Sequence, residues 1–87
     1  MVILPARDEG PRVGLVVDEI RRTLPGVEVV VIENGSTDDT ALRARDAGAT
    51  VLRSAPGYAM ALKVGFGYAE RQKAPWVATV DADGQHP

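Results

Sequence analysis

The chain has 87 residues, room for one small domain, with 45% apolar and 25% charged residues, a formal net charge of −2 and no cysteine. This is the composition of a globular protein, and it lacks the excess of basic residues that nucleic acids and anionic membranes require of a partner. Disulfides and thiolate metal sites are excluded, and the first residues show no signal-peptide pattern, so we expect a cytoplasmic protein without nucleic-acid partners.

The first three predicted elements are a strand, a helix and a second strand. Val2 to Leu4 is a short apolar run ended by Pro5, which indicates a buried strand. From Pro11 to Leu24 the apolar residues recur at helical spacing, and a Pro-Gly pair follows. Val27 to Ile32 is almost wholly apolar and rich in β-branched residues, which is typical of a strand covered on both faces.

The alternation continues with a short helix and a third strand. Ser36 or Thr37 is expected to cap a second helix that runs to about Ala47, and Gly48 supplies a left-handed stop. Residues 50–54 then form the third predicted strand, and an Ala-Pro-Gly turn follows it.

The last predicted elements are a helix from Tyr58 to about Gln72 and a strand from Trp76 to Val80. Small residues at every fourth position mark the helix, and this stripe consists of Gly57, Ala61, Gly65 and Ala69. The stripe lets the helix pack closely, and at Gly57 it leaves the backbone free to approach a ligand. Close packing alone also explains the stripe.

Strands and helices that alternate at this pitch predict an α/β fold, a Rossmann-like and mostly parallel sheet with helices on both faces. Right-handed crossovers favour the strand order 3-2-1-4. Ligands bind such sheets beyond the carboxyl ends of the strands, where the order reverses, here between strands 1 and 4. The polar clusters PARDEG, ENGSTDDT and DADGQHP follow strands 1, 2 and 4, so all three fall at this edge.

Asp81 and Asp83 are separated by one residue, so in an extended segment both carboxylates point the same way. Two such donors hold Mg²⁺ or Mn²⁺, which takes remaining ligands from a diphosphate and neutralises its charge. A solvated acidic turn is the alternative. His86, the lone histidine, is a further candidate ligand, although a single histidine near a terminus is more often simply exposed.

The loops after strands 1 and 2 offer candidate nucleotide contacts. The carboxylate of Glu33 can accept a hydrogen bond from the N–H of a base, and Gly35 permits a positive φ. A turn with a helix cap is the alternative, which we favour for Asp38 and Asp39 because acidic residues complement a helix dipole. Residues 7–9, Arg-Asp-Glu, either contact a nucleotide or cover the start of the first helix.

In chain order, VILPARDE, VVVIENGSTDDT, GYAMALKVGFGYA and VATVDADGQHP resemble the opening half of the family 2 glycosyltransferases, which have the GT-A fold. The last segment looks most like the branch of polyprenyl-phosphate (dolichol-phosphate) mannose and glucose synthases. The resemblance implies that Asp81 and Asp83 hold a divalent metal, Mg²⁺ or Mn²⁺, and the diphosphate. The residues it implies at the nucleotide, base, sugar or acceptor are Pro5, Arg7, Glu9, Glu33, Gly35, Gly57, Asp81 and Gln85.

The reaction implied by the resemblance is inverting transfer of a sugar from a UDP- or GDP-sugar to an acceptor, for which polyprenyl phosphate is a candidate. Family members continue well past the D-x-D segment. We therefore expect residues 1–87 to be a truncated donor-binding segment that transfers no sugar alone and forms homo-oligomers through an open sheet edge. The alternatives are a non-catalytic nucleotide-binding module and a haloacid-dehalogenase-type phosphatase, whose motif DADG echoes.

The sequence departs from the family pattern at several positions. The family usually has tyrosine where Arg7 stands, asparagine at Asp8, and lysine or leucine at Tyr58. It usually has two aspartates where Glu33 and Asn34 stand, so the contact to the base differs by one methylene and one charge.

Overall fold

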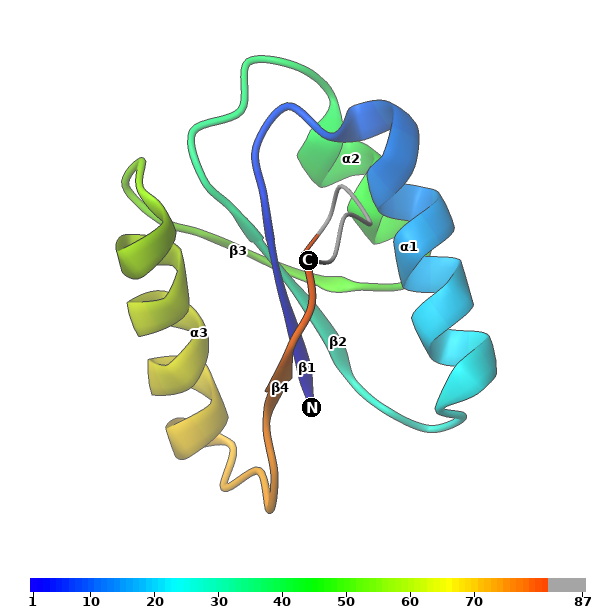
Figure 1. Ribbon diagram of the computed structural model, residues 1–87, viewed down its shortest axis with the longest axis vertical. Coiled ribbons are helices and arrows are strands. Elements are labelled where there is room, and N and C mark those ends of the chain that lie inside the picture. Colours follow the sequence, from blue (N-terminus) through cyan, green and yellow to red (C-terminus); the bar gives the residue numbers. More distant parts are fainter. Residues whose placement is uncertain (82–87) are drawn as a thin grey trace.

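The computed structural model describes residues 1–81, which fold into a four-stranded sheet and three helices (Figure 1). The elements in chain order are β1 (Val2–Ala6), α1 (Gly10–Thr23), β2 (Val29–Glu33), α2 (Thr40–Asp46), β3 (Thr50–Arg53), α3 (Tyr58–Arg71) and β4 (Ala78–Thr79). No helix in this part of the chain is long and apolar enough to cross a membrane. Asp83, Gln85 and His86 lie outside the described residues.

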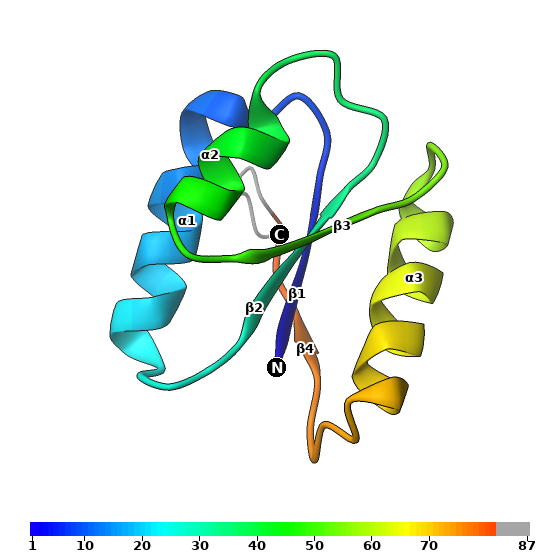
Figure 2. The same cartoon turned by 180° about the vertical axis from the view of Figure 1, so that it is seen from behind.

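All strand pairs are parallel, and the order β3-β2-β1-β4 confirms the prediction of 3-2-1-4. Helices cover both faces of the sheet (Figures 1 and 2). α1 and α2 pack on the face that carries Leu4 and Val31, whereas α3 packs on the face that carries Ile3 and Val30. The central strands β1 and β2 are therefore buried along almost their whole length, as the predicted α/β class requires.

β1 is longer than predicted, because Pro5 lies inside the strand and does not end it. Successive residues of β1 face alternate neighbours: Ala6 accepts a hydrogen bond from Asn34 at the end of β2, and Ile3 accepts one from Val80 after β4. By this alternation Pro5 faces β4, where it has no N–H to donate. The pairing with β2 therefore continues to the end of β1, whereas the pairing with β4 stops before Pro5.

β4 is shorter than predicted, with two residues in place of the five in segment 76–80. Both of its residues are exposed, and among residues 1–81 it pairs with β1 alone. Trp76 and Val77, which lead into it, are 48% and 36% exposed. An apolar strand with one unpaired edge is a surface that attracts further strands.

α2 starts at Thr40, so the prediction that Ser36 or Thr37 caps it is wrong. A capping side chain accepts hydrogen bonds from the first amides of its own helix. Here the Ser36 hydroxyl accepts the N–H of Asp8 at 2.9 Å, and the Thr37 hydroxyl donates to Asp8 Oδ1 at 3.2 Å. Residues 34–39 therefore form a loop that is hydrogen-bonded to the segment after β1, and α2 begins only at Thr40.

The other helix and strand boundaries agree with the prediction to within two residues. Gly48 has a φ of +98°, which confirms the left-handed stop after α2. On α3 the small residues Ala61, Gly65 and Ala69 are buried, and a Cβ at Gly65 would lie 2.7 Å from Cγ2 of Ile3. The stripe therefore packs closely on β1, which leaves the N-terminus of α3 and Gly57 at the carboxyl edge of the sheet.

Candidate functional site

The carboxyl ends of β1 and β2 carry two loops that lie side by side at one end of the sheet (Figures 1 and 2). We call residues 7–9 the first loop and residues 34–39 the second loop. The strand order reverses between β1 and β4, and the ligands of parallel α/β sheets bind beyond the carboxyl ends at such a point. The two loops, with the residue that follows β4, form the candidate site.

Three consecutive backbone amides at the start of α1 donate hydrogen bonds to side chains of the second loop and of α2. The pairs are Asp8 N with Ser36 Oγ at 2.9 Å, Glu9 N with Thr40 Oγ1 at 3.0 Å and Gly10 N with Asp38 Oδ2 at 3.2 Å. The first amides of a helix have no acceptor within the helix. The second loop and the first residue of α2 supply these acceptors from about thirty residues further along the chain.

The first loop also accepts hydrogen bonds from the second loop, at the side chain of Asp8. Asp8 Oδ1 accepts the N–H of Thr37 at 2.8 Å and the Thr37 hydroxyl at 3.2 Å. Asp8 has a positive φ of 52°, a conformation that aspartate and asparagine adopt more readily than most residues. The two loops are therefore held together by hydrogen bonds in both directions.

The buried Thr40 and the exposed Asp38 connect this network to the start of α2. Thr40 is fully buried, and its hydroxyl accepts from Glu9 and donates to Asp38 Oδ1. Asp38 Oδ1 also accepts the N–H of Thr40 at 3.0 Å. The hydrogen bond from the Thr40 side chain is the main reason that the pKa of Asp38 lies below its usual value, with the amides of Thr40 and Gly10 adding to the effect.

Glu33, the predicted base contact, ends β2 and is only 6% exposed. One carboxylate oxygen accepts the N–H of Ser36, and the other lies 4.0 Å from Nε of Arg53 at the end of β3. A buried carboxylate needs such partners. The sequence analysis did not consider Arg53, although its position at the end of a parallel strand places it at this edge.

The loop after β3 closes the far side of the second loop. The Ser54 hydroxyl donates to Oδ1 of the buried Asn34 at 3.3 Å. A Cβ at Gly35 would lie 3.1 Å from Cγ of Pro56, and Gly35 has a φ of +88°. The positive φ expected at Gly35 is therefore confirmed, and Gly57, with a φ of +118°, precedes the first residue of α3 at the same edge.

Asp81 is exposed and follows Val80, whose N–H donates to Ile3 at 3.0 Å. Asp81, Val80 and Ala78 line a mainly apolar groove of about 370 Å³ against α1. An exposed carboxylate beyond β4 has the oxygen chemistry that Mg²⁺ and Mn²⁺ take as a ligand. Within residues 1–81 no three acidic or histidine side chains gather as a complete metal cluster, and the predicted second ligand, Asp83, lies outside this part.

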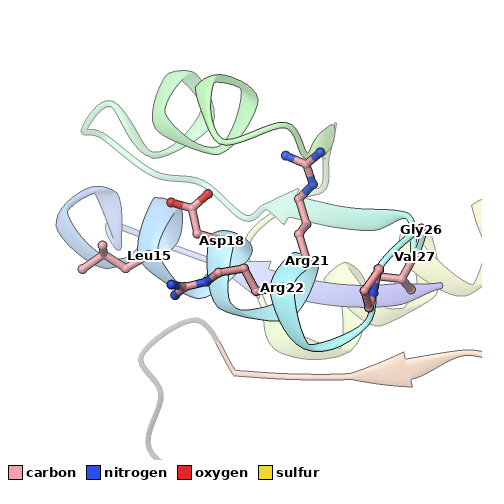
Figure 3. A pocket seen from close by; sticks show the side chains of 7 residues that line it. Leu15, Asp18, Arg21, Arg22, Gly26 and Val27 are labelled. Atoms are coloured by element: carbon pink, nitrogen blue, oxygen red, sulfur yellow. The ribbon is translucent and has the colours of Figure 1, made fainter.

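A larger groove lies elsewhere, at the C-terminal end of α1, where Arg21, Arg22 and Gly26 surround a space of about 810 Å³ (Figure 3). Arg21 spans from this groove to the carbonyl of Ala47 at 2.8 Å, so it connects α1 to the end of α2. This groove is at the amino end of the sheet, opposite the two loops, and none of the predicted site residues lines it.

The structure brings most of the predicted nucleotide contacts to one edge. At this edge Glu9 is partly buried and Glu33 is buried. Pro5 lies in β1, two residues before the first loop, and Arg7 is exposed at the start of that loop. The sequence analysis missed Thr40 and assigned Asp38 to its own helix. A buried threonine at the start of a helix carries no sequence signal that identifies a partner about thirty residues earlier.

The strand order and the helices on both faces define an α/β protein with a Rossmann-like parallel sheet. The sequence model of glycosyl transferase family 2 matches residues 1–87, and the chain belongs to this family. The predicted family is thus confirmed.

Known relatives share this part of the chain. A glucosyl-3-phosphoglycerate synthase of Mycolicibacterium paratuberculosis is 47% identical over 53 residues, 59% of this chain and 16% of its own length. A 4,4'-diaponeurosporenoate glycosyltransferase of Staphylococcus aureus is 45% identical over 51 residues, 59% of this chain and 14% of its own length. The chain therefore corresponds to a small part of each of these proteins.

Two crystal structures of glucosyl-3-phosphoglycerate synthase from Mycobacterium tuberculosis match the fold with a TM-score of 0.72 and 30% identity. One contains Mg²⁺ and UDP, and the other contains Mn²⁺, UDP-glucose and phosphoglyceric acid. The match covers 93% of this chain and 32% of the solved chain.

Proposed function

We propose that residues 1–87 form the donor side of a family 2 glycosyltransferase and bind a nucleotide diphosphate sugar at the carboxyl edge of β1, β2 and β4. The observation that carries this proposal is the convergence, at the point where the strand order reverses, of the two bonded loops, the buried Glu33 and the exposed Asp81. The donor found with the solved relative, UDP-glucose, supports a UDP-sugar.

In this proposal the side chains of Arg7 and Glu9, with the ends of β1 and β2, hold the nucleoside. Pro5, Arg7 and Glu9 line the nucleotide, and the Glu33 oxygen that faces Arg53 accepts a hydrogen bond from the base. The other Glu33 oxygen is held by Ser36, which fixes the orientation of the carboxylate. Gly35 and Gly57 let the backbone approach the ligand, and Gln85 would face the sugar or acceptor.

The diphosphate is proposed to lie at the end of β4. Asp81, with Asp83 beyond the described residues, would hold Mg²⁺ or Mn²⁺, the two ions found in the crystal structures of the relative. When bound, such an ion supplies positive charge that stabilises a departing nucleoside diphosphate. The chain's own contribution is to place a carboxylate at the edge of the sheet, next to the strand that carries Pro5.

The acceptor is proposed to carry a phosphate group. A phosphate oxygen is already anionic and needs no strong base to act as the nucleophile. Polyprenyl phosphate is the candidate that the sequence favours, and phosphoglyceric acid, found with the solved relative, is a second one. A cytoplasmic location remains a prediction from composition alone.

A non-catalytic nucleotide-binding module is the second candidate. Residues 1–87 match only 32% of the solved relative, and this small share favours such a module for these residues by themselves. The phosphatase alternative is wrong, because the chain belongs to glycosyl transferase family 2. In addition, Asp81 follows β4 at the edge of the sheet, whereas that motif belongs on a first strand.

Titration calorimetry with UDP and GDP tests donor binding. We expect binding in Mn²⁺ that EDTA removes, and Asp81→Asn should weaken it at least about tenfold because a charged ligand of the metal is lost. Asp18→Asn is the matched control, since it removes another exposed carboxylate, from α1 and away from the edge. Equal affinity in EDTA and in Mn²⁺ would contradict the metal role.

An activity assay separates the two candidate functions. The 87-residue chain is incubated with UDP-glucose or GDP-mannose and Mn²⁺, with polyprenyl phosphate or phosphoglyceric acid as acceptor, and release of nucleoside diphosphate is measured. We expect release at the background rate, since transfer requires both substrates to be positioned. Metal-dependent turnover that Asp81→Asn abolishes would show that these residues form a complete enzyme.

We also propose that the open edge of β4 pairs with the same edge of a second copy of the chain. Trp76 and Val77 expose apolar surface there, and β4 has one unpaired edge among residues 1–81. Such edges recruit partner strands. Light scattering that shows a clean monomer at high concentration would contradict this assembly.

A further inference from the structure

We propose that Asp38 is a positioning residue for the donor site. By accepting the N–H of Gly10 at the start of α1, Asp38 holds the first loop against the second loop. This inference rests on the proposed function, because it concerns the same edge of the sheet. It differs from the sequence-based interpretation, in which Asp38 complements the dipole of its own helix.

The carboxylate of Asp38 accepts hydrogen bonds from the first residues of two helices, α1 and α2. Its Oδ2 accepts the first amide of α1, from Gly10 at 3.2 Å, and its Oδ1 accepts the N–H of Thr40 at 3.0 Å. The Thr40 hydroxyl donates to the same Oδ1. A carboxylate that receives amides from two helix ends makes charge-assisted hydrogen bonds, which are stronger than neutral ones. Removing the charge therefore loosens both loops at once.

The same contacts determine where a diphosphate cannot lie. In dinucleotide-binding βαβ units the phosphates bind the amides at the N-terminus of the first helix. Here the amides of Asp8, Glu9 and Gly10 already donate to Ser36, Thr40 and Asp38. A phosphate brought to this helix would find no free donor in these three amides and would face the Asp38 carboxylate. The phosphate charge must therefore be met elsewhere on the edge.

Asp8 is the second half of the connection between the two loops. Its contacts with Thr37 both use Oδ1 as an acceptor. Asparagine would supply the same acceptor oxygen and tolerates the positive φ of 52°. The charge of Asp8 is therefore dispensable for the connection, whereas its side-chain oxygen is not.

The experiment compares Asp38→Asn with Asp39→Asn by UDP titration in Mn²⁺, at a temperature at which both variants are folded. The two changes remove the same charge from the same loop, but the ion pair of Asp39 is with Arg43 of α2, at 2.8 Å, in an exposed position. We expect about a tenfold weaker affinity for Asp38→Asn and a change of less than about twofold for Asp39→Asn. A lower melting temperature with wild-type affinity would show that Asp38 is merely structural and would overturn the proposal.

A second pair of variants keeps the test valid if Asp38→Asn does not fold. Asp8→Asn retains the acceptor oxygen and should bind UDP as the wild type does, whereas Asp8→Ala removes it and should bind several-fold more weakly. Asp8 is exposed, so neither change disturbs the core. Equal affinities of Asp8→Asn and Asp8→Ala would overturn the proposal.

Amide hydrogen exchange of the ligand-free chain separates failure of this inference from failure of the proposed function. The amides of Asp8, Glu9 and Gly10 should be protected in the wild type, and Asp38→Asn should reduce the protection of Gly10. Unprotected amides in the wild type would overturn the inference, whatever the protein binds. Protected amides in a wild type that binds no nucleotide would overturn the proposed function and, with it, the donor-site role of Asp38.

Discussion

β1 has two different flanks. Toward β2 it pairs over five residues, from Val2 with Val29 to Ala6 with Glu33, and the pairing leads directly into two loops bonded to each other. Toward β4 it pairs over two residues, and the neighbouring strand is exposed. The first flank is completed by contacts within residues 1–81, whereas the second leaves apolar surface uncovered. The nucleoside contacts of the proposed site lie on the completed flank and its metal ligand on the open one.

This difference predicts a different role for each flank of β1 in binding the donor. The bonded loops hold Glu33 and Glu9 in place before any ligand arrives, since their partners are protein groups. The carboxylate of Asp81, by contrast, is exposed beyond the end of β4. Preorganised groups bind without an ordering cost. We therefore expect the nucleoside end of the donor to be recognised by a prepared surface and the diphosphate end to depend on the metal.

The largest effect is expected from breaking the bonded flank at its buried centre. Thr40→Val keeps the size of the side chain but leaves the amide of Glu9 and the carboxylate of Asp38 without a hydroxyl partner. The cost of unpaired polar groups predicts a loss of about 1–3 kcal/mol in the free energy of unfolding, measured by urea denaturation. Thr37→Val, at an exposed position, is the control and should cost less than about 1 kcal/mol. Equal losses would contradict the role of Thr40.

The next effect concerns the open flank. Val77→Lys places a charge beside β4 and should weaken self-association by about an order of magnitude, because charged edges resist strand pairing. Leu15→Lys is the matched control: Leu15 is 69% exposed on α1, away from this edge, and its replacement should leave association unchanged. Sedimentation velocity over a range of concentrations measures both. The same reduction in both variants would indicate association through general apolar surface and not through β4.

The sequence predicted the parts of the fold that depend on local patterns. Val27 to Ile32 has the continuous apolar character of a central strand, and the strand order follows from the alternation of elements and the handedness of crossovers. It did not predict the bonding of the loops. Ser36 and Thr37 have side chains that commonly cap helices, but here both are hydrogen-bonded to Asp8 in the loop after β1. Local preference was overridden by a long-range contact.

The placement of the candidate site was predictable for a similar reason, and its contacts were not. Parallel strands bring their carboxyl ends to one edge, so the residues that follow β1 and β2, and Asp81 after β4, had to converge. Which oxygen bonds to which amide depends on distances of a few tenths of an ångström. Pro5 shows the limit: the sequence predicts that proline ends a strand, whereas in β1 it ends only the pairing on the side that it faces.

A smaller effect is expected from giving β1 the donor that it lacks. Pro5→Ala supplies an N–H that faces β4, and this should lengthen the pairing and increase the protection of β4 amides in hydrogen exchange. The net hydrogen bond contributes about 0.5–1.5 kcal/mol, and the loss of proline's restraint on the unfolded chain offsets about 0.4–1 kcal/mol. Stability should therefore change by less than about 1 kcal/mol. Unchanged protection of β4 would show that Pro5 is not what limits the pairing.

The smallest effect is a dependence on pH at the bonded flank. Hydrogen bonds from Thr40 lower the pKa of Asp38 in the folded protein, so the folded state binds the proton of this carboxyl less readily than the unfolded state. The resulting stabilisation is fully present above the unfolded pKa, near pH 4, and is lost as the pH falls through the lower folded pKa. Protonated aspartate and asparagine have similar shapes and each presents a donor. The melting temperatures of the wild type and Asp38→Asn should therefore differ at pH 7 and converge at an acidic pH below both pKa values. A difference of the same size at both pH values would mean that geometry, and not charge, accounts for the contribution of Asp38.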